Sequence, residues 1–332
     1  MRILVTGAPG WLGTELVREL DETDHEVRCL TLVGEDTSEL DQFDVETYPG
    51  DVRKLDTLSD AFEGGIDAVF HCAGIIHPPT LFGADAFFEI NADGTRNMLE
   101  ASRQADVDHF VYVSSNAAQG FNDSPTELMT EEMACQPESN YGESKYMAEQ
   151  HVRRYHQQHD LDFTIVRPCW YYGPRQPERM NRLMNMIKGG NPIIFGDGMN
   201  LRSMTYVPSL VDALLAVMDQ PSVSKNETYW IADERPYTTN YIYRTIADIL
   251  GVAEDLQPIY VPKPVSRLME IADVTLGNLG MYEQNVHVAG EMSRHIACDP
   301  SKAKAELDWE PPVDLTEGMQ ESVEWAHERG HI

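Results

Sequence analysis

The sequence predicts an α/β fold in which helices cover both faces of a parallel sheet, and two patterns carry this prediction. Short apolar runs occur at residues 2–7, 26–32, 46–52, 67–74, 109–115 and 163–168. Amphipathic helical patterns such as GTELVRELDE and NADGTRNMLEASRQA lie between them. Strands that are apolar throughout, each followed by a helix, are typical of a doubly wound parallel sheet, which binds ligands at the carboxyl ends of its strands.

Size and cysteine usage limit the class of protein. The chain has 332 residues, enough for one large α/β unit or two fused lobes. Its five cysteines are scattered and form no C-x-x-C pair, so neither a disulfide framework nor a zinc site is expected. The first residues lead into a strand rather than a secretory signal, and no apolar run approaches the roughly 18 residues of a membrane span. We therefore expect a cytoplasmic protein without membrane contact.

The charge balance is strongly acidic. The chain carries 55 acidic and 25 basic residues, for a net charge of −30. Such a surface repels nucleic acid and anionic membranes, so neither is expected as a partner. Two explanations of the charge stay open: adaptation to a high-salt cytoplasm, where screening tolerates dense acidic charge, and an ordinary acidic protein.

The first apolar run ends in a Gly-rich turn, TGAPGWLG. Gly7, Gly10 and Gly13 follow the spacing G-x-x-G-x-x-G, and a helix is expected to begin near Trp11. Glycines allow the backbone to turn tightly and to approach a pyrophosphate, while the helix directs its first amides at the anion. An ordinary strand-to-helix turn is the alternative, but the position between an apolar strand and an amphipathic helix favours dinucleotide binding.

Eight segments in order along the chain resemble one family. They are TGAPGWLG (6–13), GDV (50–52), HCAG (71–74), INADGTRNMLEA (90–101), VYVSS (111–115), YGESK (141–145), VRPCWYYGP (166–174) and LRSMTYV (201–207). Together they resemble the extended short-chain dehydrogenase/reductases of the NAD-dependent epimerase/dehydratase family, similar to UDP-galactose 4-epimerases.

The resemblance implies a division into two parts. A Rossmann-type NAD(P)-binding domain would span residues 1–168, with 204–233 returning to it. A smaller, mixed C-terminal substrate-binding lobe would comprise residues 169–203 and 234–332. The family usually forms homodimers through the helix that contains Tyr141, so a homodimer is expected as well.

The catalytic residues that the resemblance implies are Ser115, Tyr141, Lys145 and Asn91. Tyr141 would exchange the hydroxyl proton while hydride moves to or from the nicotinamide. Its phenol alone has a pKa near ~10, and an ammonium four residues along the same helix face would favour the phenolate. Ser115 would hydrogen-bond the reacting oxygen, with Ser114 as the less favoured choice. Asn91 would position Lys145, which also holds the nicotinamide ribose.

Cofactor contacts implied by the resemblance gather at the strand ends. The residues are Gly7, Gly10, Trp11, Leu12, Gly13, Thr31, Asp51, Val52, Ala73, Gly74, Tyr141, Lys145 and Pro168. Thr31 and Leu32 stand where an acid usually selects NAD and an arginine NADP. The nearby Glu35 and Asp36 would repel a 2′-phosphate, so NAD is favoured and NADP stays open.

Substrate contacts are expected from Ser115, Asn116, Trp170, Tyr171 and Arg202. Arg202 matches an arginine that contacts the diphosphate of nucleotide sugars, a role suited to its planar donor fork. Three further arginines and an additional tyrosine lie close by, at Arg175, Arg179, Arg182 and Tyr172. Each of these side chains can instead pack in the core or pair with surface acids. No metal is expected, because no third ligand accompanies His71 and His77 at useful spacing.

The reaction type is narrowed by one loop. Nucleotide-sugar dehydratases carry Thr-Asp-Glu where this chain has Ser115, Asn116 and Ala117, so elimination of water lacks its acid and base. Epimerisation through a ketone, or net oxidation or reduction, remains. The run SSNAAQG also departs from the Tyr-Gly ending common in epimerases.

Three function classes stay open. The main prediction is NAD(P)-dependent hydride transfer on a nucleotide sugar, as a 4-epimerase or ketoreductase. The segment 263–290 is reminiscent of 3β-hydroxysteroid- and dihydroflavonol-type dehydrogenases, although we expect it to pack onto the lobe rather than line an apolar pocket. A non-catalytic dinucleotide-binding scaffold is the alternative of another class.

Overall fold

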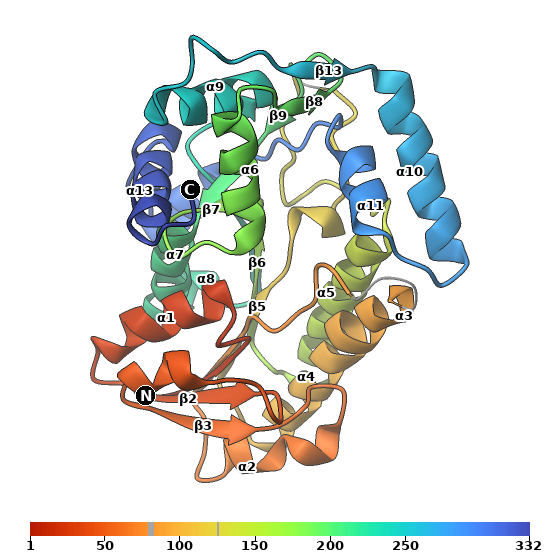
Figure 1. Cartoon of the computed structure of the whole chain (residues 1–332). Coiled ribbons are helices and arrows are strands. Elements are labelled where there is room, and N and C mark those ends of the chain that lie inside the picture. Colours follow the sequence, from red (N-terminus) through yellow and green to blue (C-terminus); the bar gives the residue numbers. More distant parts are fainter. Residues whose placement is uncertain (79–82, 125) are drawn as a thin grey trace.

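A parallel seven-stranded sheet forms the centre of the computed structural model, which describes residues 1–78, 83–124 and 126–332 (Figure 1). Its strands are β1 (Arg2–Thr6), β2 (Glu26–Thr31), β3 (Val45–Pro49), β4 (Ala68–His71), β5 (His109–Val113), β6 (Phe163–Pro168) and β11 (Glu227–Ile231). Their order in the sheet is β11-β6-β5-β4-β1-β2-β3. The order reverses between β1 and β4, which is where a doubly wound sheet opens a ligand crevice.

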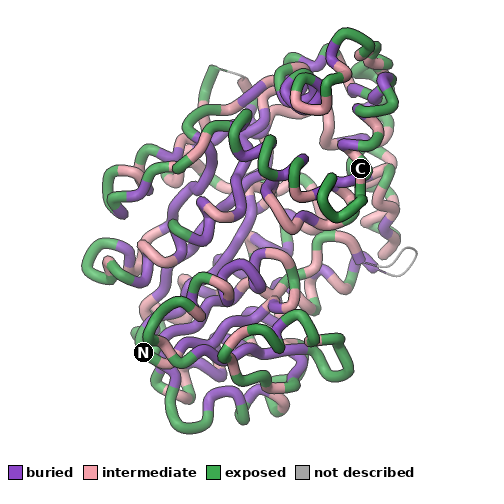
Figure 2. The backbone as a smooth tube through the Cα atoms, turned by 60° about the vertical axis from the view of Figure 1, so that its left-hand side comes forward, coloured by how far each residue is buried: buried purple, intermediate pink, exposed green. Residues whose placement is uncertain are grey.

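Helices cover both faces of the sheet. One face packs against α1 (Trp11–Asp21), α7 (Val207–Asp219) and α12 (Ser301–Leu307). The other packs against α2 (Ser59–Phe62), α4 (Gly94–Gln104) and α5 (Asn140–His159). Side chains alternate along β1, so that Ile3 and Val5 join the first core and Leu4 the second. Figure 2 shows buried backbone running through the central strands, with exposed segments around them.

The predicted α/β class and doubly wound sheet are confirmed. The first six strands fall within the predicted apolar runs, apart from a start one residue earlier for β3. Three of them, β3, β4 and β5, end two or three residues before the apolar run does, because the final residues leave the ladder to form the loops around the candidate site. The seventh strand, β11, was not identified as a strand from the sequence.

A third core, separate from the two that flank the sheet, lies beyond the carboxyl ends of the strands. It packs α6 (Glu178–Lys188), α9 (Thr239–Ile249) and α13 (Leu315–Glu328) around buried tyrosines. Short strand pairs brace it: β7 (Trp170–Tyr172) with β10 (Met204–Tyr206), β8 (Ile193–Phe195) with β13 (Ile259–Val261), and β9 (Leu201–Arg202) with β12 (Tyr237–Thr238). The helices α10 (Lys263–Asn278) and α11 (Gln284–Glu291) pack side by side at the edge of the molecule (Figure 1).

The remaining short elements connect these layers. They are the helical turns Ser38–Gln42, Leu55–Thr57 and Asn116–Ala118, the helices α3 (Ala84–Ala86) and α8 (Pro221–Ser224), and the π-helical segment Phe87–Asp93. The π-helical segment continues directly into α4, so residues 84–104 form one helical rod that carries Asn91. Within the described ranges, every helix is too short or too polar to cross a bilayer.

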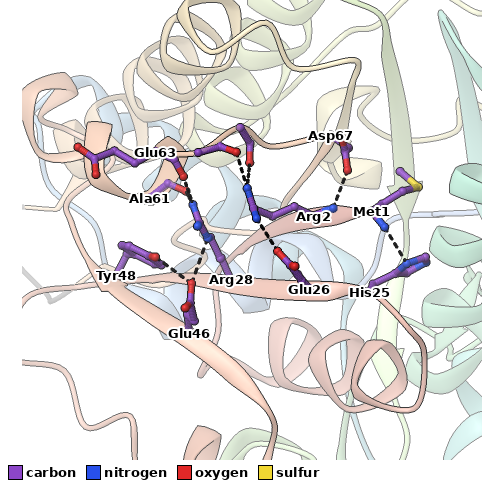
Figure 3. Close-up of polar contacts among 12 residues, drawn as sticks. Met1, Arg2, His25, Glu26, Arg28, Glu46, Tyr48, Ala61, Glu63 and Asp67 are labelled. Carbon is purple, nitrogen blue, oxygen red and sulfur yellow. Dashed lines mark hydrogen bonds and ion pairs between the residues drawn. The ribbon is translucent and has the colours of Figure 1, made fainter.

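Arginines at the amino ends of the strands are structural. Figure 3 shows Arg2 and Arg28 among the acids and carbonyls that surround them. Arg2 donates to Glu26 at 2.7 Å, and Arg28 donates to the carbonyl of Glu63 at 2.6 Å and lies 3.3 Å from Glu46. These two arginines therefore already have partners within the protein, whereas some arginines at the opposite end of the sheet have no acidic partner among the described residues.

Candidate active site

The Gly-rich turn is packed too tightly for side chains. Gly7 has φ +90°, and a Cβ on it would lie 2.7 Å from the backbone of Cys72 and Ala73. A Cβ on Gly10 or Gly13 would come within 2.6 Å of Gly7. The turn from β1 thus touches the loop after β4 and leaves the first amides of α1 facing the crevice, which suits a pyrophosphate.

Hydrogen bonds hold the two sides of this crevice together. The Thr6 hydroxyl lies 2.7 Å from Nδ1 of His71, and the Ala73 amide donates to the Thr6 hydroxyl at 3.1 Å. On the other side, Trp11 Nε1 donates to the carbonyl of Pro174 at 3.0 Å. Burial lowers the pKa of His71 to about 3, so this histidine is a neutral hydrogen-bonding residue. Within the described residues, no three His, Cys, Asp or Glu side chains gather as a metal site.

The adenosine side of the crevice carries an arginine that the sequence analysis did not consider. Arg53 donates to Asp51 through Nε at 2.9 Å and Nη2 at 2.7 Å, and this pairing lowers the pKa of Asp51. Arg53 is therefore neutralised in place. At the end of β2, the Glu35 carboxylate accepts the Leu32 amide at 3.2 Å, which places an acid where a ribose hydroxyl would be recognised.

The other residues implied to bind the cofactor differ in which backbone or side-chain groups face the crevice. Thr31 is buried and its carbonyl accepts the Gly50 amide at 2.8 Å, while Val52 accepts from Asn97 at 2.8 Å. Leu12 is buried in the first core, so it presents backbone rather than side chain to the crevice. Pro168 is the last residue of β6 and pairs with Ile231.

Tyr141 and Lys145 lie in the first turns of α5. The Ser139 hydroxyl caps this helix by accepting the Gly142 amide at 3.1 Å. Lys145 is buried, and its Nζ donates to the carbonyl of Val113 at 2.8 Å and lies 4.6 Å from the ring centroid of Tyr112. Lys145 is thus anchored to the end of β5.

The electrostatics of this pair differ from the expectation. Burial raises the pKa of the Tyr141 phenol, and the groups that counteract it are the Ser115 hydroxyl and the Arg179 guanidinium. Burial lowers the pKa of Lys145 to about 8, partly offset by Glu149. The expected effect of Lys145 on the phenol is replaced by that of Arg179, because the ammonium is turned toward Val113.

The two adjacent serines have separate roles. Ser114 donates to Glu149 at 2.6 Å, so its hydroxyl is occupied inside the core. Ser115 accepts only a long bond of 3.2 Å from the Ala117 amide and lies beside Tyr141. Asn116 follows at the start of a helical turn and is half-buried. The geometry therefore leaves Ser115 available to a ligand and Ser114 not.

Asn91 is tied to the backbone beneath the site. Its amide bonds both backbone groups of Ile75, at 2.8 and 3.0 Å, and donates to Ser144 at 3.0 Å. A Cβ on Gly74 would lie 3.1 Å from Asn91 Oδ1 and 3.7 Å from Lys145 Nζ. Asn91 therefore fixes the loop after β4 against α5, close to Lys145 but without a direct bond to it among the described contacts.

Arg202 is a buried cation with a free donor. It is 4% exposed, and its Nη2 donates to the carbonyl of Glu291 at 2.6 Å. Its guanidinium lies 5.8 Å from the ring centroid of Trp170, while its Nε has no partner among the described atoms. Tyr171, also from β7, is half-buried and lies edge-on to Trp11 at 6.2 Å.

The arginines that precede and begin α6 divide into two kinds. Arg175 pairs with Glu15 of α1 and is therefore occupied. Arg179 and Arg182 have no acidic partner in the described part of the chain. Both act, after burial, to lower the pKa of His77 to about 4, so they face the loop after β4 across the site.

A cavity of about 180 Å³ lies beside Tyr141. Its lining includes Phe87, Ser139, Tyr141, Asp273, Tyr282 and His287. The segment 263–290 was expected to pack onto the lobe; α10 and α11 pack against each other and also form this wall. The wall is polar rather than apolar, with Tyr282 2.6 Å from His77 and Asp273 2.8 Å from His287.

Comparisons with known proteins agree on one family. The model of the NAD dependent epimerase/dehydratase family matches residues 3–232. A protein of Sinorhizobium fredii named only as uncharacterized protein y4nL is 36% identical over 345 residues, 99% of this chain and 96% of that protein. A putative UDP-glucose 4-epimerase of Methanocaldococcus jannaschii is 28% identical over 331 residues, 97% of each. The crystal structure of UDP-glucose 4-epimerase from Thermotoga maritima with UDP-glucose has a TM-score of 0.79 at 26% identity, covering 99% of both chains.

Proposed function

Because the chain belongs to the NAD-dependent epimerase/dehydratase family, we propose that it is a nucleotide-sugar 4-epimerase, which interconverts a sugar hydroxyl and a ketone. The observation that carries the proposal is Arg202, a buried guanidinium whose Nε has no partner among the described atoms and which, like Tyr141, is acted on by the charge of Glu291. An uncharged substrate would not require such a cation, whereas a diphosphate would.

The comparisons confirm the resemblance predicted from the sequence and the enzyme class. The protein is an NAD-dependent enzyme of the extended short-chain dehydrogenase/reductase type. The relatives include UDP-glucose 4-epimerases and dTDP-glucose 4,6-dehydratases, which supports the nucleotide-sugar interpretation and does not favour the steroid or flavonol alternative. The dehydratase branch is a poor match in chemistry, because Asn116 and Ala117 supply neither its acid nor its base.

The residues of the crevice fit NAD. The backbone of the Gly-rich turn can approach a pyrophosphate, Glu35 stands at the end of β2, and Arg53 is paired with Asp51 rather than free to bind a 2′-phosphate. Bound NAD supplies the nicotinamide that accepts and returns a hydride. The family resemblance implies that Lys145 of α5, whose ammonium contacts the end of β5, holds the nicotinamide ribose.

Proton transfer falls to Tyr141 and its neighbours. The Tyr141 phenolate takes the proton of the sugar hydroxyl as the ketone forms, and the resulting phenol returns it when the alcohol is restored. Ser115 donates a hydrogen bond to the reacting oxygen, and the positive charge of Arg179 favours the phenolate against the effect of burial. Glu149, buried with Arg167 at 2.6 Å, keeps a negative charge near Lys145.

The diphosphate would lie between β9 and α6. Arg202, Arg179 and Arg182 present guanidinium groups that no described acid occupies, and Trp170 and Tyr171 offer ring faces beside them. The substrate part would then comprise residues 169–203 and 234–332, and the cofactor part residues 1–168 with 204–233. We further propose a cytoplasmic homodimer that pairs through α4 and α5, which lie together on the outer side of the sheet (Figure 1).

One experiment tests the reaction. The purified protein is analysed for bound NAD and then incubated with UDP-, GDP- and dTDP-hexoses, with product identity read by chromatography and nicotinamide absorbance followed in parallel. Retained NAD and an epimeric sugar support the 4-epimerase, whereas net absorbance change on the sugar indicates a ketoreductase. Turnover of hydroxysteroids alone would refute the nucleotide-sugar proposal.

Tyr141→Phe isolates the proton-transfer step. The variant keeps the ring but has no proton to exchange, so we expect at least a 1,000-fold loss of turnover, roughly the upper contribution of a positioned acid–base group. NAD binding, measured by fluorescence titration, should stay within a factor of about three. An active variant would remove Tyr141 from the mechanism.

A further inference from the structure

We propose that Glu291 is a specificity residue of this site, which admits sugars that are uncharged beside Tyr141 and excludes hexuronates. The inference rests on the proposed nucleotide-sugar function and adds the class of sugar. Nothing in the family motifs points to this residue, because it directly follows the segment 263–290, which resembles the sugar epimerases least.

The position of Glu291 links the two ends of the substrate site. It is the last residue of α11, and its carbonyl accepts from Arg202 at 2.6 Å. Its carboxylate lies 3.5 Å from Nε2 of His287, which lines the cavity beside Tyr141. The side chain is 30% exposed, so the carboxylate is held on one side and open on the other.

The acids around Glu291 are not fully neutralised. Glu138 and Glu270 both pair with Arg294, at 2.6 and 2.5 Å. Asp273 and Glu291 share His287, at 2.8 and 3.5 Å. Burial acts to lower the pKa of His287, but the bond to Asp273 and the charge of Glu291 together raise it above its usual value. Even a protonated His287 would balance only one of these two carboxylates, and Glu291 is the more distant of the two.

The site is therefore polarised across Tyr141. Burial raises the pKa of the phenol first; Glu291 raises it further and Arg179 lowers it, so an anion on α11 and a cation on α6 act on the same phenol. A diphosphate bound at Arg202 and Arg179 leaves its sugar ring directed toward Tyr141 and the acidic wall. Sugar hydroxyls can donate to a carboxylate there, whereas a sugar carboxylate would meet like charge.

Glu291 makes two separate contacts. Its backbone carbonyl accepts the Arg202 donor, and its negative charge raises the pKa of that guanidinium against the effect of burial. Its carboxylate lies 3.5 Å from His287, in a small pocket that shares His287 and Ser139 with the cavity beside Tyr141.

UDP-glucose and UDP-glucuronate form the matched pair for the test, because they differ only in a hydroxymethyl group against a carboxylate at C5 of the ring. If the hexose panel shows preference for thymidine, the dTDP pair replaces them. Two carboxylates about 7 Å apart at an effective dielectric of about 20 repel enough for roughly a 50-fold discrimination. We expect the wild-type protein to prefer the neutral sugar in kcat/KM by at least about tenfold.

Two substitutions separate charge from shape. Glu291→Gln keeps the size and removes the charge, and should raise kcat/KM for the glucuronate so that the preference falls at least about tenfold, mainly through KM. Glu291→Asp keeps the charge and should retain the preference. Glu324→Gln, an exposed change of the same kind on α13, should leave both substrates as they were.

The outcomes distinguish the two levels of the proposal. Equal use of both sugars by the wild-type protein, or an unchanged preference in Glu291→Gln, would overturn the role of Glu291 while leaving the epimerase proposal in place. Absence of turnover and of binding by calorimetry for every nucleotide sugar would overturn the proposed function itself.

Discussion

Replacing Lys145 with methionine should stabilise the fold at neutral pH while abolishing turnover. The ammonium is 5% exposed at the end of β5, and burial lowers its pKa from 10.5 to about 8. At about 1.4 kcal/mol for each tenfold change in the proton equilibrium, keeping this group charged costs about 3 kcal/mol at pH 7. Loss of the bond to the Val113 carbonyl and of the contact with Tyr112 destabilises the variant by about 1–2 kcal/mol. The variant should therefore be more stable by about 1–2 kcal/mol at pH 7.

The sign of the effect reverses at alkaline pH. Between the folded pKa of about 8 and the unfolded value near 10.5, the unfolded wild-type chain binds more protons than the folded one. The free energy of unfolding of the wild-type protein therefore rises with pH in that window, whereas the methionine variant has no such group and no such rise. The advantage of the variant should vanish near pH 9 and become a deficit by pH 10.

Urea denaturation at pH 7, 8, 9 and 10, followed by tryptophan fluorescence, measures this difference. Tyr141→Phe is the matched control in the same helix, because burial raises the pKa of its phenol above its usual value of 10, so the folded and unfolded chains both keep this proton from pH 7 to pH 9. A Lys145→Met protein that is less stable at pH 7, or whose difference from wild type is the same at pH 7 and pH 10, would refute the reasoning.

Three further substitutions test other parts of the molecule. Arg167→Met leaves the Glu149 carboxylate, 2% exposed, without its cation and should cost about 3–5 kcal/mol of unfolding free energy; a loss below about 1 kcal/mol would contradict a buried ion pair. Burial raises the pKa of Asp233 to about 7, so the stability of the wild-type protein falls as pH rises from about 4 to 7. Asp233→Asn should flatten that slope and be more stable than the wild type by up to about 4 kcal/mol at pH 8. The same slope in both proteins would exclude a role for Asp233 in this pH dependence. Arg202→Met should raise KM for the nucleotide sugar at least about tenfold with NAD binding unchanged, whereas Arg267→Met on the surface of α10 should change neither.

Local patterns made the sheet and the cofactor crevice predictable. Six of the seven strands of the sheet lie in the predicted apolar runs, and the three glycines lie within one turn, so both signals come from neighbouring residues. The choice of Ser115 over Ser114 also follows from a local feature. Alternation along β5 and the loop after it turns the first serine toward Glu149 and leaves the second at the site.

Contacts between distant segments were not predictable in the same way. Arg179 and Glu291 act on Tyr141 from α6 and α11, and no spacing in the sequence connects these three residues. The contact between Lys145 and Val113 was not predictable either. A four-residue spacing places two side chains on one helix face, but the carbonyl of Val113, from another strand, decides where the ammonium points.

The segment 263–290 shows the limit of composition as a guide. Its apolar residues suggested packing, yet the residues that matter at the cavity are the polar ones between them, Asp273, Tyr282 and His287. Which helix face turns inward depends on α11 packing against α10, a tertiary contact that the sequence pattern alone does not specify.

The arginines that no described acid occupies have a consequence for how substrates arrive. Both NAD and a nucleotide sugar are anions, and a molecule with net charge −30 repels them before they reach Arg179 or Arg202. Added salt screens that long-range repulsion, since the Debye length shrinks to about 3 Å at 1 M, while the contact with a buried guanidinium is screened much less. Encounter rates with anionic ligands should therefore increase with ionic strength, the reverse of the usual behaviour of enzymes that attract such ligands electrostatically.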